Sequence, residues 1–285
     1  MKKLLYIFLL CTTLTACEEV IDVDVPENNP RLIVDALIRI DSDKTVTIAE
    51  ISTKVTSSFF EEVQPADIDL LTITNLDYID ADPSDENSIT FSRIGPGRYQ
   101  AIKDTDFFTN GELQLNVAYN GQSYVANTEY VPSTPIINLE QGDDTLFGGD
   151  ETEVEITFTD DGSRDDFYLV DFDFNEFLVT EDEFYNGQTF KFSYFYNDNV
   201  QESDEVTISV LGIDEPFFNY MNQLIIQSSG DQGPFQTPAT TVRGNLINTA
   251  TINPDGSFNT IENSDNFALG YFSVNETFSA SLTIQ

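Results

Sequence analysis

The sequence contains no histidine and no tryptophan, and only two of its 285 residues are cysteines. Without histidine the chain cannot form a Ser-His-Asp triad or a Cys-His pair, and it lacks the usual ligands of a zinc site. Basic residues are also scarce, because 12 lysines and arginines stand against 50 aspartates and glutamates. We therefore expect no nucleic-acid partner, since binding nucleic acid requires clustered basic side chains.

The first 16 residues have the parts of a bacterial export signal. Lys2 and Lys3 form a basic start, and the apolar run of residues 4–10 is shorter than the stretch of about 20 that spans a bilayer. The segment Leu14-Thr15-Ala16-Cys17 resembles the lipobox of bacterial lipoproteins. That resemblance implies that residues 1–16 are removed and that Cys17 is acylated, for example with palmitate. The alternative is an ordinary secretory signal with an incidental cysteine.

The composition of the mature chain restricts its chemistry. Cys11 is lost with the signal and Cys17 is acylated, so neither a disulfide nor a thiol nucleophile is expected. The remaining 50 acidic side chains face ten basic ones, and an anionic membrane surface would repel this body, so anchoring should depend on the acyl chains. Carboxylates are the main groups left for catalysis, and no pair among them stands out.

Residues 17–30 predict a tether. The stretch is acidic and is closed by Pro26 and Pro30, which disfavour a core strand. Acidic residues directly after the lipidated cysteine resemble the signal that sends Bacteroidota lipoproteins to the exterior face of the outer membrane. A merely solvated linker is the alternative interpretation.

Period-two patterns predict that the chain is mainly β. Apolar residues alternate through 32–40, and Val46 and Ile48 continue this spacing after a turn, which predicts a first hairpin. Asn120-Gly121 is typical of a tight hairpin turn. With about seven short strands in about 100 residues and no convincing helix, residues 31–131 are interpreted as an immunoglobulin-like β-sandwich.

A second β-rich domain with one helix is predicted for residues 136–285. Pro132 and Pro135 mark the crossing between the two domains. An aromatic row at alternate positions 190–196 favours a core strand over a ligand platform. A helix near 214–228 is indicated by Asp214 as its cap and by Phe217, Met221, Leu224 and Ile225 on one face. Residues 242–252 and 267–274 predict closing strands.

One loop is a candidate cation site. Asp160, Asp161, Asp165 and Asp166 surround Gly162, and clustered carboxylates can offer calcium the six to eight oxygens that it prefers. The spacing does not fit an EF-hand loop. A charged turn between two strands explains the cluster equally well.

Several short motifs, in this order, resemble a family of Bacteroidota lipoproteins known as domain of unknown function 4249. They are the lipobox with Cys17, Gly97-Arg98-Tyr99, Gly121-Gln122-Ser123-Tyr124, Asp166-Phe167-Tyr168, Phe184–Phe190, Gly233–Pro238, Arg243-Gly244-Asn245-Leu246 and Ala268-Leu269-Gly270-Tyr271-Phe272. The resemblance implies an outer-membrane lipoprotein, often encoded beside TonB-dependent receptors, without an established enzymatic activity. Cys17, as the lipidated residue, is the only residue whose role this resemblance implies.

Three functions are consistent with these features. The leading hypothesis is a noncatalytic surface lipoprotein that assists a TonB-dependent transporter, by holding substrate or by docking on it. The second is a calcium-stabilised adhesion or glycan-binding module, suggested by the acidic loops. The third is a carboxylate-type hydrolase, for which the sequence offers only unassigned acids.

Overall fold

The computed structural model describes residues 30–57, 62–77, 87–146, 148–149, 151–197, 200–228, 241–252 and 267–285. The strands and helices in these ranges follow the order β1 (Leu32–Ile40), β2 (Val46–Val55), β3 (Gln64–Pro65), β4 (Leu70–Asn75), β5 (Ser88–Thr90), β6 (Ser92–Gly95), β7 (Arg98–Asp104), α2 (Thr105–Thr109), β8 (Leu113–Tyr119), β9 (Gln122–Thr128), β10 (Tyr130–Val131), β11 (Ile136–Gln141), β12 (Thr152–Thr159), β13 (Phe167–Asp171), β14 (Phe177–Glu181), η2 (Asp182–Phe184), β15 (Thr189–Tyr196), β16 (Glu205–Ile213), α3 (Glu215–Ser228), β17 (Ile247–Asn248), η4 (Thr249–Thr251) and β18 (Leu269–Thr283).

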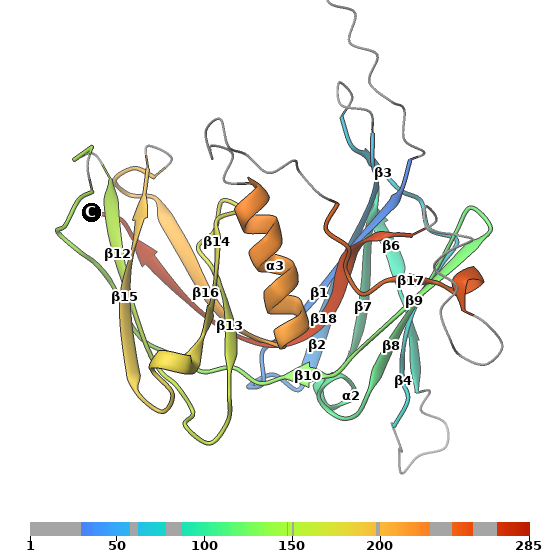
Figure 1. Ribbon diagram of the computed structural model, residues 1–285, viewed down its shortest axis with the longest axis horizontal. Coiled ribbons are helices and arrows are strands. Elements are labelled where there is room, and N and C mark those ends of the chain that lie inside the picture. The colour runs from blue at the N-terminus through green and yellow to red at the C-terminus, as the bar shows by residue number, and fades with distance from the viewer. Residues whose placement is uncertain are drawn as a thin grey trace, which may run out of the picture.

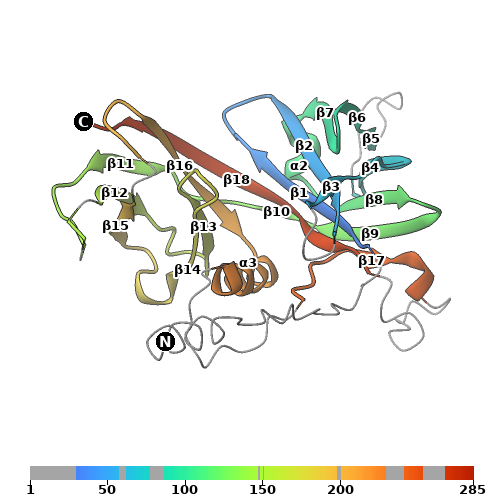
Figure 2. The ribbon, with the colours of Figure 1, turned by 90° about the horizontal axis from the view of Figure 1, so that it is seen from above.

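A ten-stranded sheet runs through the whole molecule (Figure 1). Its strand order is β14-β13-β16-β18-β1-β2-β7-β6, with β10 beside β18 and β3 beside β2. β18 has 15 residues, and its two halves pair differently. Its first half is parallel to β1, and its second half is antiparallel to β16. Figure 2 shows β18 crossing from one side of the molecule to the other. One long strand therefore joins strands that are far apart in the sequence.

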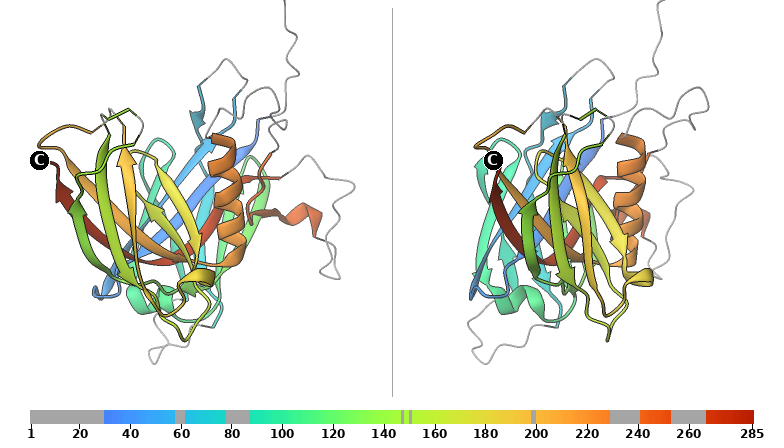
Figure 3. Two further views of the ribbon diagram at one scale, coloured as in Figure 1. Left: turned by 60° about the vertical axis from the view of Figure 1, so that its left-hand side comes forward. Right: turned by 90° about the vertical axis from the view of Figure 1, so that its left-hand side faces the viewer.

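Two smaller sheets cover this large sheet, one on each half. The sheet β17-β9-β8-β4-β5 faces β1, β2 and β7 across a core that includes Val34, Ile38, Ile73, Leu115 and Phe272. The sheet β11-β12-β15 faces β13, β16 and the end of β18 across a second core. Figure 3 shows the second pair of layers from the side. The prediction of a mainly β fold with sandwich-like layers is confirmed.

The aromatic row of β15 belongs to the second core, as the sequence predicts. Phe190, Phe192 and Tyr194 pack against this core from partly buried positions, and Tyr196 is fully buried. The Tyr185 and Phe190 rings stack at 4.3 Å between centroids. These rings stabilise the layers and leave no open aromatic platform on this strand.

The crossing between the two predicted domains is held firmly. The Ser133 backbone N–H donates to Glu276 Oε2 at 2.7 Å, and the Ser133 hydroxyl donates to the Val210 carbonyl at 3.1 Å. The first core also contains Leu246, Ala268, Phe272 and Val274 from the C-terminal part of the chain. The boundary at residues 131–135 stays a prediction, and the two halves share β18.

Helix α3 begins as predicted. Asp214 Oδ1 accepts a hydrogen bond from the Phe217 backbone N–H at 2.8 Å, which is the geometry of an N-cap. The helix packs against β13, β14 and the start of β18, where Phe217 is buried. Its second half is more open, and Leu224 is 36% exposed. The short helix α2 was not predicted, because five residues carry too little periodicity to reveal it.

The predicted first hairpin is confirmed, because β1 and β2 pair antiparallel. Asp35 pairs with Ser52, so the even-numbered residues of β2, which include Val46 and Ile48, lie on the outer face of the sheet. Ile48 pairs with Ile102 of β7, and both are exposed. The closing strand expected at residues 242–252 was wrong, because the described part of this range contains only a two-residue strand and a 3-10 turn. The strand expected at 267–274 is present from residue 269 on, as the start of the much longer β18.

Candidate functional site

The predicted lipidation site lies outside the described residues. Cys17, the signal of residues 1–16 and all of the acidic tether except Pro30 fall in that part of the chain. Their roles therefore stay predictions. Among the residues that the structure describes, no helix is both long and apolar enough to cross a membrane.

The four aspartates of the predicted cation site do not converge. Asp160 and Asp166 are buried on either side of the Tyr168 hydroxyl, which lies 2.7 Å from Asp160 Oδ1 and 3.1 Å from Asp166 Oδ2. Asp161 and Asp165 are exposed. Within the described ranges, no group of three or more acidic, histidine or cysteine side chains is arranged to hold a metal ion.

Protein groups already occupy the oxygens of this loop. Arg164 Nη2 lies 3.0 Å from Asp166 Oδ2, and the Gly187 backbone N–H donates to Asp160 Oδ2 at 2.7 Å. Asp161 accepts from the backbone N–H and the hydroxyl of Ser163, and these bonds lower the pKa of its carboxyl. Burial raises the pKa of Asp166, although the Arg164 charge opposes the increase. The arrangement suits a structural turn, and a calcium titration is needed to test the calcium alternative.

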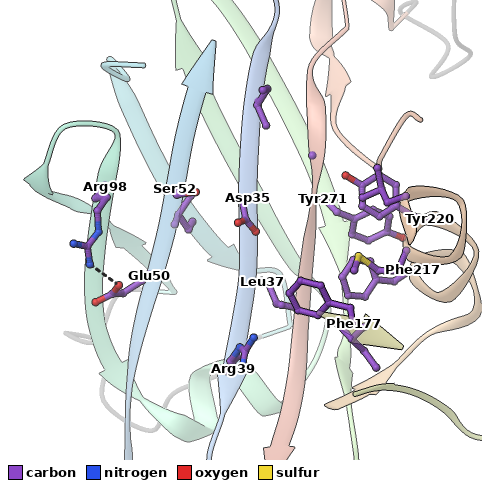
Figure 4. A pocket seen from close by; sticks show the side chains of 16 residues that line it. Asp35, Leu37, Arg39, Glu50, Ser52, Arg98, Phe177, Phe217, Tyr220 and Tyr271 are labelled. Carbon is purple, nitrogen blue, oxygen red and sulfur yellow. Dashed lines mark hydrogen bonds and ion pairs between the residues drawn. The ribbon is translucent and has the colours of Figure 1, made fainter. Parts of the chain in front are cut away.

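A cavity lies elsewhere, between α3 and the outer face of the large sheet. We call it the α3 groove, and its volume is about 480 Å³. Its floor is a row of side chains from four adjacent strands. Tyr271 of β18 pairs with Asp35 of β1, Asp35 pairs with Ser52 of β2, and Ser52 pairs with Arg98 of β7. Because paired residues share a face of the sheet, all four point into the groove (Figure 4).

One wall of the α3 groove is aromatic and apolar. It consists of Phe177, Phe217, Tyr220, Met221, Leu224 and Tyr271. The Tyr271 ring lies 4.6 Å from that of Phe217 and 4.9 Å from that of Tyr220, measured between centroids. These contacts fix the orientation of the rings, and Figure 4 shows them across the groove from Asp35. The wall therefore offers a preformed apolar surface to a ligand.

The opposite wall is charged, and most of its charges are paired. Arg98 Nη2 lies 3.3 Å from Glu50 Oε2, and Gln100 donates to Glu50 Oε1 at 3.0 Å. Arg39 pairs with Asp171 of β13 at 2.5 Å, a contact that also joins the two halves of the molecule. Asp35 has no such partner, because no lysine or arginine nitrogen of the described residues lies within 4 Å of its carboxylate.

The environment of Asp35 disfavours its charge. The side chain is open to water at the mouth of the groove, but protein surrounds its other sides, and this desolvation raises the pKa of its carboxyl. The charges of Lys54 and Arg39 and hydrogen bonds from the Leu37 backbone and Ser52 oppose the increase without cancelling it. Burial, helped by the Asp35 charge, raises the pKa of Tyr220 to about 12.

A smaller cavity is also lined by the two tyrosines. It has a volume of about 250 Å³ and shares Tyr220 and Tyr271 with the α3 groove. Its other side chains include Asn219, Gln223, Arg243 and Asn245. The Arg243 guanidinium stacks 3.7 Å from the centroid of the Phe267 ring. The tyrosine pair therefore lines both cavities.

Sequence reasoning missed the α3 groove, although β1 carried a signal for it. The residues between its buried positions alternate apolar and charged as Ile33, Asp35, Leu37 and Arg39. A strand that faces only water on one side would not need apolar residues there, so this pattern indicates a covered outer face. The covering element, α3, could not be deduced from it.

Comparison with known proteins identifies a family but no function. No curated protein matches the chain significantly. A family model described as a domain of unknown function, DUF4249, matches residues 18–276, which is most of the chain. The match includes every strand and helix of the α3 groove, apart from the last residues of β18. The chain therefore belongs to the DUF4249 family.

Proposed function

We propose that this protein is a noncatalytic lipoprotein of the outer membrane that serves a TonB-dependent transporter. Lipidated Cys17 anchors it, the acidic tether of residues 17–30 places it on the exterior face, and the α3 groove captures substrate for the transporter. The observation that carries the proposal is the groove itself, a preformed cavity with a rigid aromatic wall opposite a charged one. Such sites are typical of small-molecule binding.

Capture is favoured over catalysis by the groups that line the α3 groove. Asp35 and Glu50 are its only carboxyl groups among the described residues, so a carboxylate hydrolase would have to use this pair. Both Glu50 oxygens already have protein partners, since Oε2 lies 3.3 Å from Arg98 Nη2 and Oε1 accepts from Gln100 at 3.0 Å, so neither is free to act as a base. With no histidine or free thiol expected, the groove offers recognition groups but no activated nucleophile.

Purification from native membranes tests this role. The tagged protein is extracted in mild detergent, and we expect a TonB-dependent receptor to copurify in comparable amount. The Cys17→Ser variant is the matched control, because it keeps the folded body but should lose the anchor. A protein that always migrates alone, before and after crosslinking in intact cells, would contradict the proposal.

A glycan-binding module is a second candidate, because the same groove places aromatic rings opposite hydrogen-bonding side chains. Sugars are commonly held by both kinds of group. Under this candidate, soluble oligosaccharides bind saturably, and Tyr220→Ala weakens the binding. Asn219→Ala is the control, since Asn219 lies on the same helix but lines only the smaller cavity. Absence of oligosaccharide binding would remove the candidate.

A further inference from the structure

One of the two carboxylates in the α3 groove has no ion pair among the described residues. Arg39 is paired with Asp171, and Arg98 is paired with Glu50. Asp35 lies on the floor of the groove, with Arg39 further along β1 and the Glu50–Arg98 pair on β2 and β7 (Figure 4). Lys54 is the nearest other cation, opposite Ile33 on the β1–β2 ladder, and its charge reaches Asp35 without an ion pair within 4 Å. Among the described residues, Asp35 is therefore the carboxylate of the groove that has no ion pair within 4 Å.

The geometry around Asp35 suits a cation more than a neutral group. Partial desolvation makes the bare carboxylate unfavourable, and a charge-assisted hydrogen bond compensates such a group best. The rings of Tyr220 and Tyr271 stand on the adjacent wall, and ring faces attract ammonium and guanidinium groups. An anion would instead meet the negative charge of Asp35 in a chain with a net charge of −38.

The rest of the aromatic wall indicates which kind of chemical group carries the cation. Phe177, Met221 and the partly exposed Leu224 continue the apolar surface beyond the two tyrosines. A volume of about 480 Å³ accommodates a small aromatic or aliphatic body but not a folded domain. A ligand that has both parts would satisfy the carboxylate and the apolar wall at the same time.

We propose that the α3 groove binds an organic cation, an ammonium or guanidinium group on an apolar body, with the cation at Asp35 and the body against the aromatic wall. The proposal rests on the proposed function for the groove as the capture site, and it adds the class of substrate. Asp35 is the specificity-determining residue. The ring faces of Tyr220 and Tyr271 contact the cation, and Met221 and Leu224 contact the apolar body of the ligand.

Calorimetric titration of the purified protein with three matched probes tests this assignment. The probes are 2-phenylethylammonium, the neutral 2-phenylethanol and the anionic 3-phenylpropanoate, which share one aromatic body. We expect the ammonium to bind at least about tenfold more tightly than the alcohol, a ratio equivalent to about 1.4 kcal/mol, and the propanoate to bind most weakly. Equal affinity for the ammonium and the alcohol, or no binding of any probe at millimolar concentration, would overturn the proposal.

Two variants localise the effect. Asp35→Asn keeps the size of the side chain and removes its charge, so the preference for ammonium should disappear while binding of the alcohol persists. Glu205→Gln removes one negative charge at the far end of β16 and should leave the preference intact. If Asp35→Asn kept the preference, or if both variants lost it equally, a general effect of the negative chain would explain the binding and the site would be wrong.

A final pair of probes separates two sources of the cation. A Phe-Gly-Gly tripeptide with a free amino terminus tests peptides, and its acetylated form is the control. Binding of the free peptide alone assigns the groove to peptide amino termini, whereas binding of 2-phenylethylammonium alone assigns it to free amines. Failure of all amines in a protein that still copurifies with a receptor contradicts only this inference. Amine binding in a protein that always purifies alone contradicts only the proposed transporter role.

Discussion

The Asn245 side chain bonds both backbone groups of Phe272. Asn245 Oδ1 accepts from the Phe272 N–H at 2.9 Å, and Asn245 Nδ2 donates to the Phe272 carbonyl at 2.8 Å. At this position β18 pairs with β1 on one edge only, so the amide replaces a strand on the other edge. The contact fixes residues 241–246 beside the start of β18 and next to Tyr271 of the groove.

Asn245→Ala should lower the free energy of unfolding by about 1–3 kcal/mol, because it leaves the backbone N–H and carbonyl of the buried Phe272 without partners. Urea unfolding measures the change. Asn219→Ala on the exposed face of α3 is the control and should stay within about 0.5 kcal/mol of the parent. Equal stability of the two variants would show that the Asn245 amide does not hold β18.

Gly270→Ala should destabilise the protein strongly. Gly270 has φ +93°, and an added Cβ would lie 1.9 Å from the Val34 carbonyl oxygen of the neighbouring β1. Gly121 in the β8–β9 turn also has a positive φ, +72°, but an added Cβ there meets nothing within 4 Å. Gly121→Ala should therefore cost only the conformational term of about 1–2 kcal/mol, and Gly270→Ala should cost clearly more. Thermal melting that ranks the two variants equally would contradict the close β1–β18 approach.

The sequence predicted elements whose signals are local. The buried face of β1, the Asn120-Gly121 turn with φ 48° and 72°, and the Asp214 cap were all visible as short patterns. The pairing of β1 with β18 was not, because it joins residues more than 200 positions apart in the chain. The α3 groove depends on that pairing, since it brings Tyr271 beside Asp35. This is why the fold class was predictable and the site was not.

The side of β2 that faces the core could not be predicted from the sequence for a similar reason. Alternation in the sequence shows that two sets of residues face opposite sides, but it does not say which side is the core when both sets contain apolar residues. In β2 the buried set contains Ala49 and Ile51, whereas Val46 and Ile48 are exposed. The pairing of Asp35 with Ser52 decides the question, and that register is a property of the folded sheet.

Asp35→Asn should stabilise the protein at neutral pH. The pKa of Asp35 is raised above 3.8 in the folded state, so its ionised form costs stability above the raised pKa, and this cost vanishes below 3.8, where both states are protonated. The variant should gain less than about 1 kcal/mol, because water at the mouth of the groove screens the charge. Unfolding free energies measured from acidic to neutral pH should diverge from the parent as pH rises.

Glu205→Gln is the control for this pH dependence and should follow the parent at each pH. A less stable Asp35→Asn at neutral pH would mean that the carboxylate is held by contacts that outweigh its desolvation. A stability cost at Asp35 agrees with a role in binding, because residues kept for a ligand often reduce the stability of the free protein.

Calcium should leave the melting temperature unchanged at millimolar concentration. Asp160 and Asp166 already contact Tyr168, and Asp166 also contacts Arg164, so a cation would have to displace these groups. Specific binding would raise the melting temperature with the logarithm of the calcium concentration above the dissociation constant. A rise that disappears in Asp161→Asn but persists in the Glu205→Gln control would contradict this expectation and support a calcium-stabilised module.

Cys17→Ser should release the protein from the membrane without changing its fold. Cys17 precedes the described domain by more than ten residues, so the substitution touches none of the contacts that hold the sheets. The acidic body should not replace the lipid, because an anionic membrane surface repels it. Fractionation of cells should find the variant in the soluble fraction and the parent in the outer membrane, with equal melting temperatures. Membrane retention of the variant in high salt would show that something other than Cys17 acylation anchors the chain. Protease added to the outside of intact cells would then identify the face of the membrane on which the protein lies.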